Sequence, residues 1–337
     1  MGHGEITLFY NIGLVLIAFF VFVFGILLFF SCKKKPIKAE ETLPVSVPPS
    51  SKLCATSYSL MDIDAATDGF NTRRIIGKGR LGTVYAAVMP RGDLVAVKRI
   101  HPRLVLTNAG FGFSSSIKSL SLADHPHVVP IIGYSEGPGE RIIVMEYEGM
   151  ISLEFYLHHN LEDGAVLLDW NQRIKIAAGV ARGIEYLHNV QIVHGCIKPS
   201  NILIDGKFRA RIGDYGLQFL EAGERQGILG YVDDEYWVMR KNGASKENDV
   251  YGLGVVLIEL LSGRKCEEGM IVNWGLPLIK QMKFDELLDQ RLGVPSDVKP
   301  LGRLAKVALA CVGNSRPNRP SISQIVTILN NVESESL

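Results

Sequence analysis

Residues 77–84 read Gly-Lys-Gly-Arg-Leu-Gly-Thr-Val, which places three glycines in a G-x-G-x-x-G-x-V pattern between two strand-like runs. Because glycine has no Cβ, a hairpin of this composition lets the backbone approach phosphate groups closely. Such a triplet alone is often a plain hairpin. Here Val95-Ala96-Val97-Lys98 follows at the distance of the next strand. Lys98 is therefore predicted to hold a phosphate rather than to be a solvated strand lysine.

A second motif occupies residues 194–201, which read His-Gly-Cys-Ile-Lys-Pro-Ser-Asn. Its His, Lys and Asn are spaced as in H-R-D-x-K-x-x-N, the protein-kinase catalytic loop, whose Asp takes the proton of the substrate hydroxyl. In this catalytic-loop motif Gly195 replaces the Arg and Cys196 replaces the Asp. A thiol has a pKa near ~8.5 in water and is a poor acceptor, whereas a general base contributes ~10²–10⁴-fold in rate. The candidate catalytic residues are thus Lys198, Asn201 and the degenerate Cys196, with at most a trace of phosphoryl transfer expected.

A third motif follows the strand-like run 209–213, where residues 214–216 read Asp-Tyr-Gly. The triplet matches the magnesium-binding D-F-G of kinases, and its tyrosine keeps the apolar ring. An accidental Asp-x-Gly turn is the alternative, but the neighbouring motifs stand in the right order. Asn201 and Asp214 are therefore predicted to be oxygen ligands for Mg²⁺.

Two further carboxylates are predicted to stabilise the C-terminal half. Residues 233–235 read Asp-Asp-Glu where kinases have A-P-E, and Glu235 is expected to form a buried pair with Arg319. Asp249 stands at the head of an apolar helix, where it could hold the backbone of the catalytic-loop motif.

Hydrophobic periodicity divides the chain into two parts and predicts an α+β fold. Residues 74–147 contain short β-branched runs broken by Gly and Pro, which indicate an antiparallel meander with one helical stretch near 113–123. Beyond Ser152 the period becomes helical. Helices are expected at 170–188, 250–262, 301–312 and 322–332.

From Tyr58 to about Val332 the chain resembles the cytoplasmic domain of plant receptor-like kinases. The resemblance is carried by the three motifs together with four phrases: Val-Met-Glu-Tyr at 144–147, Leu-Asp-Trp-Asn-Gln-Arg at 168–173, Ala-Arg-Gly-Ile-Glu-Tyr-Leu-His at 181–188 and Asp-Val-Tyr-Gly-Leu-Gly at 249–254. It implies a bilobal protein-kinase fold, with a small antiparallel-sheet N-lobe over about 58–147 and a helical C-lobe over about 148–332.

The resemblance also implies a site for ATP and Mg²⁺. The implied nucleotide-binding residues are Gly77, Lys78, Gly79, Gly82, Val84, Ala96, Lys98, Met145, Glu146, Tyr147 and Leu203. An apolar spine joining the two lobes is implied for Leu120, Ile131, His194 and Tyr215.

Besides Cys196, three departures from the family pattern indicate that catalysis is weak or lost. Ser116 stands where the family's helix brings a Glu to the strand lysine, and no Glu occurs between residues 42 and 135, so Lys98 must hold phosphates unpaired or find another acid. Gly195 removes the arginine that receives an activation-loop phosphate. No Ser or Thr lies between Asp214 and Glu235, so phosphorylation on Ser or Thr cannot order that segment.

Bulk composition excludes several other classes of protein. The formal net charge of +1, without a basic stripe interleaved with aromatics, excludes a nucleic-acid binder. The five cysteines are scattered and contain no C-x-x-C pair, which indicates neither a disulfide framework nor a zinc site and favours a reducing compartment.

Residues 12–30 form an uninterrupted apolar run, close to the about 20 residues that cross a bilayer as a helix. Three lysines follow at 33–35, and no Lys or Arg precedes the run, so the positive-inside rule predicts residues 1–11 outside and everything after Cys32 in the cytosol. The alternative is a cleaved signal peptide, which lacks support because no basic n-region is present. We expect a single-pass plasma-membrane protein with almost no ectodomain and a juxtamembrane linker over 31–57.

Three functions are compatible with these observations. The leading hypothesis is a membrane-anchored receptor-like pseudokinase that binds ATP weakly and acts as a regulatory or scaffolding partner of active receptor kinases or other membrane signalling proteins. The second is a weakly active Ser/Thr kinase that uses the intact Lys98, Asn201 and Asp214. The third is a membrane adaptor that binds no nucleotide.

Overall fold

The computed structural model describes residues 54–107, 112–147, 149–159, 166–220, 228–238, 244–267, 269–313 and 315–336. Residues 52–337 form one compact unit. The apolar run at 12–30 and most of the linker lie outside the described residues, so the membrane span stays a prediction. Within the described ranges, none of the helices has the length and apolar character needed to cross a bilayer.

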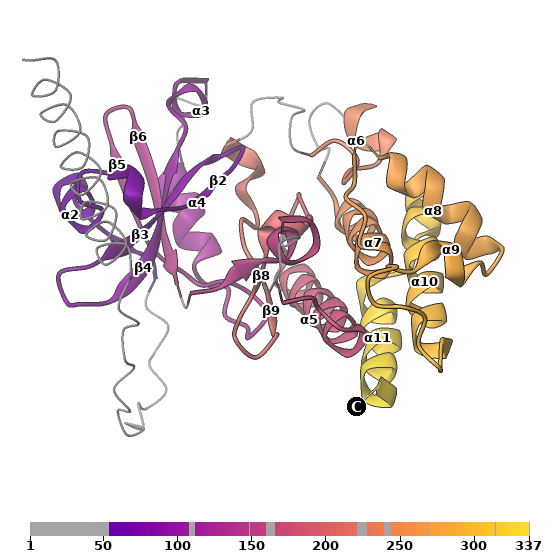
Figure 1. The fold of residues 1–337 in the computed structure, drawn as a ribbon. Coiled ribbons are helices and arrows are strands. Elements are labelled where there is room, and N and C mark those ends of the chain that lie inside the picture. Colours follow the sequence, from indigo (N-terminus) through magenta and orange to yellow (C-terminus); the bar gives the residue numbers. More distant parts are fainter. Residues whose placement is uncertain are drawn as a thin grey trace, which may run out of the picture. The chain divides into compact units, whose positions relative to one another are not determined.

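The N-terminal half of this unit is a six-stranded sheet in the order β1-β5-β6-β4-β3-β2 (Figure 1). The strands are β1 (Thr56–Ser57), β2 (Ile75–Lys78), β3 (Gly82–Val88), β4 (Leu94–Ile100), β5 (Ile131–Gly137) and β6 (Glu140–Glu146). The pairs from β2 to β6 are antiparallel, which confirms the predicted meander. β1 was not predicted, and it adds to β5 in parallel.

Three helices accompany the sheet: α2 (Leu60–Ala66), α3 (Pro102–Thr107) and α4 (Phe113–Leu120). α4 corresponds to the helix expected near 113–123. It buries Phe113, Ile117 and Leu120, which recur at the spacing of one helical face. The helix ends at Leu120, three residues before the predicted end, and the Ser121 amide closes its last turn by donating to the Ile117 carbonyl.

The C-terminal half is helical. Its helices are α5 (Trp170–Asn189), α6 (Asp234–Val238), α7 (Lys246–Ser262), α8 (Met270–Lys280), α9 (Phe284–Leu287), α10 (Lys299–Val312) and α11 (Ile322–Ser336). A small sheet of β7 (Ile151–Ser152), β8 (Ile202–Ile204) and β9 (Ala210–Ile212) lies beside α5 (Figure 1). The four predicted helices are confirmed. α7 begins four residues before the apolar run because the Ser245 hydroxyl caps it by accepting from the Asn248 amide.

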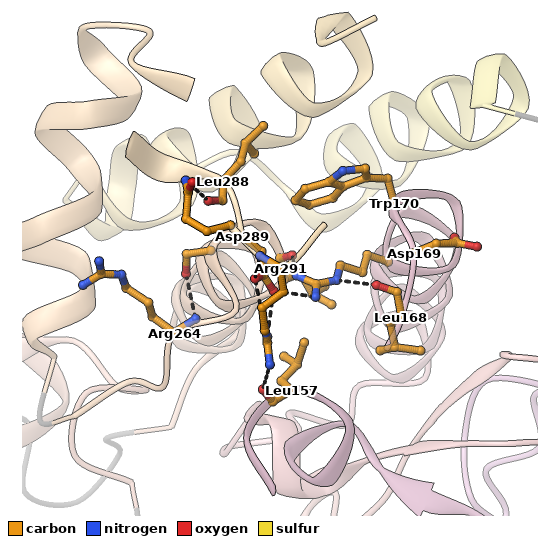
Figure 2. A network of polar contacts seen from close by, with 12 residues as sticks. Leu157, Leu168, Asp169, Trp170, Arg264, Leu288, Asp289 and Arg291 are labelled. Carbon is orange, nitrogen blue, oxygen red and sulfur yellow. Dashed lines mark hydrogen bonds and ion pairs between the residues drawn. The ribbon is translucent and has the colours of Figure 1, made fainter. Parts of the chain in front are cut away.

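A buried ion-pair network fastens α5 to the helices around it. Arg173 of α5 is fully buried, and its Nη2 lies 2.6 Å from Oδ2 of Asp289. Its Nη1 donates to the Leu260 carbonyl of α7. Arg291 also binds Asp289 and donates to the Leu157 carbonyl, so the one carboxylate holds two guanidinium groups (Figure 2). The network thereby joins four segments of the chain: α5, α7, residues 289–291 and the segment that contains Leu157.

Candidate functional site

A cleft of about 640 Å³ is bounded by the six-stranded sheet and by the small sheet β7-β8-β9. Nine of the predicted nucleotide-binding residues line it: Gly77, Lys78, Val84, Ala96, Lys98, Met145, Glu146, Tyr147 and Leu203. Asn201 and Asp214 also line it. The backbone and side chains of β2, β3, β4 and β6 therefore converge with β8 on one cavity, as the sequence motifs predict.

A second cavity of about 390 Å³ adjoins this cleft and shares Lys98, Asn201 and Asp214 with it. Its walls come from the glycine-rich loop on one side and the catalytic-loop motif on the other, including Gly79, Cys196 and Lys198. The predicted phosphate-binding and catalytic positions are thus brought together.

Gly82 lines neither cavity, although it was predicted to bind nucleotide. It pairs with Ile100 across β3 and β4, and a Cβ at this position would lie 2.1 Å from the Arg99 carbonyl oxygen. By contrast, a Cβ on Gly79 would have its nearest neighbour at 3.9 Å. Gly82 is therefore required by close packing of the strands, whereas Gly79 leaves space above the loop.

Lys98 of β4 is buried and forms an ion pair with Asp214. Burial alone would raise the pKa of the Asp214 carboxyl, but the charge and hydrogen bond of Lys98 hold this pKa below its usual value. Ser116 is half-buried on α4, a helix whose sequence contains no acid. Of the two alternatives predicted for Lys98, an unpaired ammonium or another acid, the structure shows the second, and that acid is Asp214.

Asn201 fixes the geometry of the catalytic-loop motif. Its Nδ2 donates to the Cys196 carbonyl at 3.0 Å, and its own carbonyl accepts from the Gly213 amide at 2.8 Å. These two bonds place the end of the motif beside Asp214.

Asp249 holds the start of the same motif, as predicted from its place before the apolar helix. Its two carboxylate oxygens accept from the backbone amides of His194 and Gly195, at 2.8 and 2.7 Å. The His188 ring nitrogen lies 2.9 Å from Oδ2 as well. The loop is therefore anchored through main-chain groups to a buried carboxylate on α7.

Residues 195 and 196, where the catalytic-loop motif departs from the kinase pattern, lie in different surroundings. Gly195 has φ +87°, and Gln218 lies over its Cα and donates from Nε2 to the Val193 carbonyl. Cys196 is buried against Ile228 and Val232 in a small apolar cluster. An apolar contact of this kind is suited to a thiol and not to a carboxylate.

The four predicted spine residues Leu120, Ile131, His194 and Tyr215 are all buried. The Tyr215 hydroxyl donates to the Leu120 carbonyl at 3.3 Å, which joins the third motif to α4. Burial lowers the pKa of the His194 imidazole and so favours its neutral form.

The predicted salt bridge between Glu235 and Arg319 is wrong. Arg319 pairs with Asp233, which also accepts two hydrogen bonds from Arg316, at 2.8 and 2.6 Å. Glu235 lies 3.5 Å from Arg316, and 41% of its side chain is exposed. The difference arises because Asp233 precedes α6 and is buried, whereas Glu235 lies within the helix, near its surface.

Sequence reasoning missed four residues of this region: Glu154, Gln218, Lys265 and Arg316. Glu154, Gln218 and Lys265 line the 390 Å³ cavity, and Glu154 pairs with Lys265 at 3.4 Å. No local pattern distinguishes these three from ordinary surface residues. Arg316 did carry a signal, since it stands in an Arg-Pro-Asn-Arg run with Arg319.

The arrangement does not fit a bound Mg²⁺ as it stands. Asp214, the predicted carboxylate ligand, is paired with Lys98 through its Oδ2 atom. The Asn201 side chain donates from Nδ2 to the Cys196 carbonyl, and this bond leaves the Oδ1 atom, the predicted metal ligand, unengaged. No group of three or more His, Cys, Asp and Glu side chains in the described parts of the chain could hold a metal ion.

Comparison with known proteins agrees with this geometry. A model of the protein kinase domain matches residues 70–327. The proline-rich receptor-like protein kinase PERK1 of Arabidopsis thaliana is 34% identical over 317 residues, covering 85% of this chain and 47% of that protein. The serine/threonine-protein kinase-like protein CCR2 of the same plant is 34% identical over 316 residues, covering 89% of this chain and 38% of that protein. The chain thus spans about half or less of the length of these two relatives.

Among solved structures, the pseudokinase domain of BIR2, described as an immune regulator of the RLK/Pelle family, is similar with a TM-score of 0.70 and 33% identity. The match covers 82% of this chain and 86% of that one. The bilobal arrangement of a sheet N-lobe and a helical C-lobe is therefore confirmed. The chain belongs to the protein kinase domain family, with plant receptor-like kinases among its relatives.

Proposed function

We propose that this protein is a receptor-like pseudokinase that binds ATP weakly and regulates active receptor kinases instead of phosphorylating substrates. The observation that carries the proposal is the contrast between the phosphate-binding positions, which are retained, and the position of the catalytic base, which is not. The glycine-rich loop, Lys98 and Asp214 still converge on one cavity, whereas the position of the catalytic base in the wall of that cavity carries Cys196, a thiol packed against Ile228 and Val232. A nucleotide pocket without a base supports binding without transfer.

The similarity to the BIR2 pseudokinase domain also supports a regulatory role, since that protein is described as an immune regulator. The retained Lys98, Asn201 and Asp214 favour the second candidate, a weakly active Ser/Thr kinase. Phosphoryl transfer depends mainly on positioning and electrostatics, so the loss of one carboxylate does not abolish it by necessity. A membrane adaptor without nucleotide is the third candidate.

One experiment separates the three candidates. Purified protein is melted with and without millimolar ATP, and phosphate transfer to itself and to a generic substrate is measured in parallel. Ligand that binds only the folded state raises its stability by about 2.7 kcal/mol at a hundredfold excess over Kd. The proposal expects a melting shift that Lys98→Ala removes, with no transfer. Magnesium-dependent autophosphorylation abolished by Asp214→Ala would favour the kinase, and an absent shift would favour the adaptor.

We also propose that the domain is held at the plasma membrane, with residues 1–11 outside and everything after Cys32 in the cytosol. The apolar run at 12–30 and the lysines at 33–35 support this orientation. An anchor in the membrane would keep the domain at high effective concentration near receptor kinases in the same membrane. Deleting residues 1–35 should therefore abolish biological activity while leaving the fold intact. A soluble and fully active truncation would contradict this role.

A further inference from the structure

The charges of the cleft have a consequence for how a phosphate chain is held. Among the described residues that line the two cavities, the carboxylates are Glu146, Glu154 and Asp214. Glu146 lies 2.9 Å from Arg211, Glu154 lies 3.4 Å from Lys265, and Asp214 is paired with Lys98. Each carboxylate is already paired with a basic group, so a divalent cation would compete with that group for the charge of the carboxylate.

The pair between Lys98 and Asp214 is the hardest of the three to separate. The Lys98 side chain is 6% exposed, and a buried ammonium group without a counter-charge is strongly destabilising. α4 carries Ser116 and no acid, so this helix offers Lys98 no replacement if a metal takes Asp214. Coordination of Mg²⁺ by Asp214 would therefore leave Lys98 to rely on the phosphates of the nucleotide for its counter-charge.

The charges of the smaller cavity favour an anion over a cation. The 390 Å³ cavity is lined by five basic side chains against two carboxylates. The basic residues are Lys78, Arg80, Lys98, Lys198 and Lys265. Hydrogen bonds from ammonium and guanidinium groups to phosphate are among the stronger ones in proteins. Lys98 and Lys265 are paired with the two carboxylates. The excess positive charge of this lining therefore comes from Lys78, Arg80 and Lys198. This excess can supply the positive charge that a metal ion usually brings to a polyphosphate.

We infer that this cleft binds a nucleotide polyphosphate without a divalent cation, with basic side chains in place of the metal. The inference rests on the proposed ATP binding and specifies its chemistry. The absence of a carboxylate at position 116 then explains the absence of a metal site in the described parts of the cleft. Without an acid on α4, Asp214 serves as the counter-ion of Lys98 and is not available to a metal ion.

The test is a calorimetric titration of the purified full-length chain with ATP, in EDTA and in excess Mg²⁺. We expect binding in EDTA, and Mg²⁺ should leave the affinity unchanged or weaken it by up to about tenfold, because the complexed phosphates carry less charge for the lysines. Binding that requires Mg²⁺ would overturn this inference and leave ATP binding itself intact. Binding in neither buffer would overturn both.

A variant tests the physical reason. Ser116→Glu returns a carboxylate to α4, so it should pair with Lys98, release Asp214 and make ATP binding tighter in Mg²⁺ than in EDTA. Ser119→Glu adds the same charge to an exposed position of the same helix and should behave as the unmodified chain does. If Ser116→Glu shows no gain from Mg²⁺ although it is folded, the role assigned to the Lys98–Asp214 pair is wrong.

Discussion

Gln218 fills the space in which a side chain on residue 195 would begin. A Cβ at Gly195 would lie 1.9 Å from Nε2 of Gln218, and that amide is held in place by the Val193 carbonyl at 3.0 Å. The segment that follows Asp214 is thus packed directly onto the catalytic-loop motif. In this protein the loss of the arginine and the position of Gln218 are parts of one arrangement.

We therefore predict that Gly195→Arg lowers the free energy of unfolding by about 2–4 kcal/mol, through overpacking and a strained backbone. Residue 195 has φ +87°, which disfavours any side chain, so Gln218→Ala should recover only part of the loss. Urea unfolding of both single variants and the double variant measures the coupling. Additive losses would show that the two residues do not compete for the same space.

Replacing Cys196 with Asp should restore little phosphoryl transfer. The new carboxylate would enter the apolar cluster with Ile228 and Val232, where burial penalises its charged form. Ser116 would remain an independent defect. We expect a lower melting temperature and transfer rates far below those of ordinary kinases, measured with radiolabelled ATP. Cys196→Ala is the control, and it should leave stability nearly unchanged. Robust transfer by Cys196→Asp would contradict the prediction.

The glycines at 79 and 82 should respond differently to the same change. Gly82→Ala places a methyl group 2.1 Å from the Arg99 carbonyl oxygen, so β3 and β4 must separate, and we expect a loss of about 2 kcal/mol or more. Gly79→Ala meets its nearest atom at 3.9 Å and should keep full stability while weakening ATP binding. Thermal unfolding and ATP titration of the two variants check this contrast. Equal effects on stability would show that the strand packing is not the constraint.

Acid should weaken the fold through Asp233. Burial alone would raise the pKa of this carboxyl, but hydrogen bonds from Arg316 and Arg319 hold it below its usual value. Because the folded pKa is depressed, the stabilisation is complete above the unfolded value near ~3.9 and is lost as the pH falls through the folded value. Asp233→Asn should therefore be less stable than the unmodified chain at pH 7, with a difference that shrinks below about pH 4.

The matched control for this acid-dependent effect is Asp234→Asn, at the exposed neighbouring position. Its stability should follow the pH profile of the unmodified chain. A difference between Asp233→Asn and the unmodified chain that stays constant from pH 7 to pH 3 would show that ionisation of Asp233 is not responsible.

The sheet, the main helices and most of the cleft could be predicted because their signals are local and repeat along the chain. Apolar residues at helical spacing mark α5 and α7, and the glycine triplet marks the turn between β2 and β3. The choice of Asp233 over Glu235 could not be made in this way. The two acids are two residues apart, and only the start of α6 decides which of them points inward.

Contacts between side chains far apart in the sequence could not be predicted either. The contact of Gln218 with Gly195 depends on the path of the backbone after residue 216, and neither residue type indicates this contact. The partner of Lys98 could be predicted in part. The sequence shows that α4 has no acid, which leaves few carboxylates that could pair with Lys98. Only the structure identifies Asp214 as the one that does.

The anchoring of the loop by Asp249 has a consequence for how such a protein can arise. Asp249 binds the amides of residues 194 and 195, and a non-proline residue presents the same amide whatever its side chain. Substitutions at 195 and 196 therefore leave these two bonds to Asp249 in place, while a side chain at 195 must still be accommodated by Gln218. A lineage could lose its enzymatic chemistry by small steps and still inherit a surface of unchanged shape, on which selection for protein recognition could continue to act.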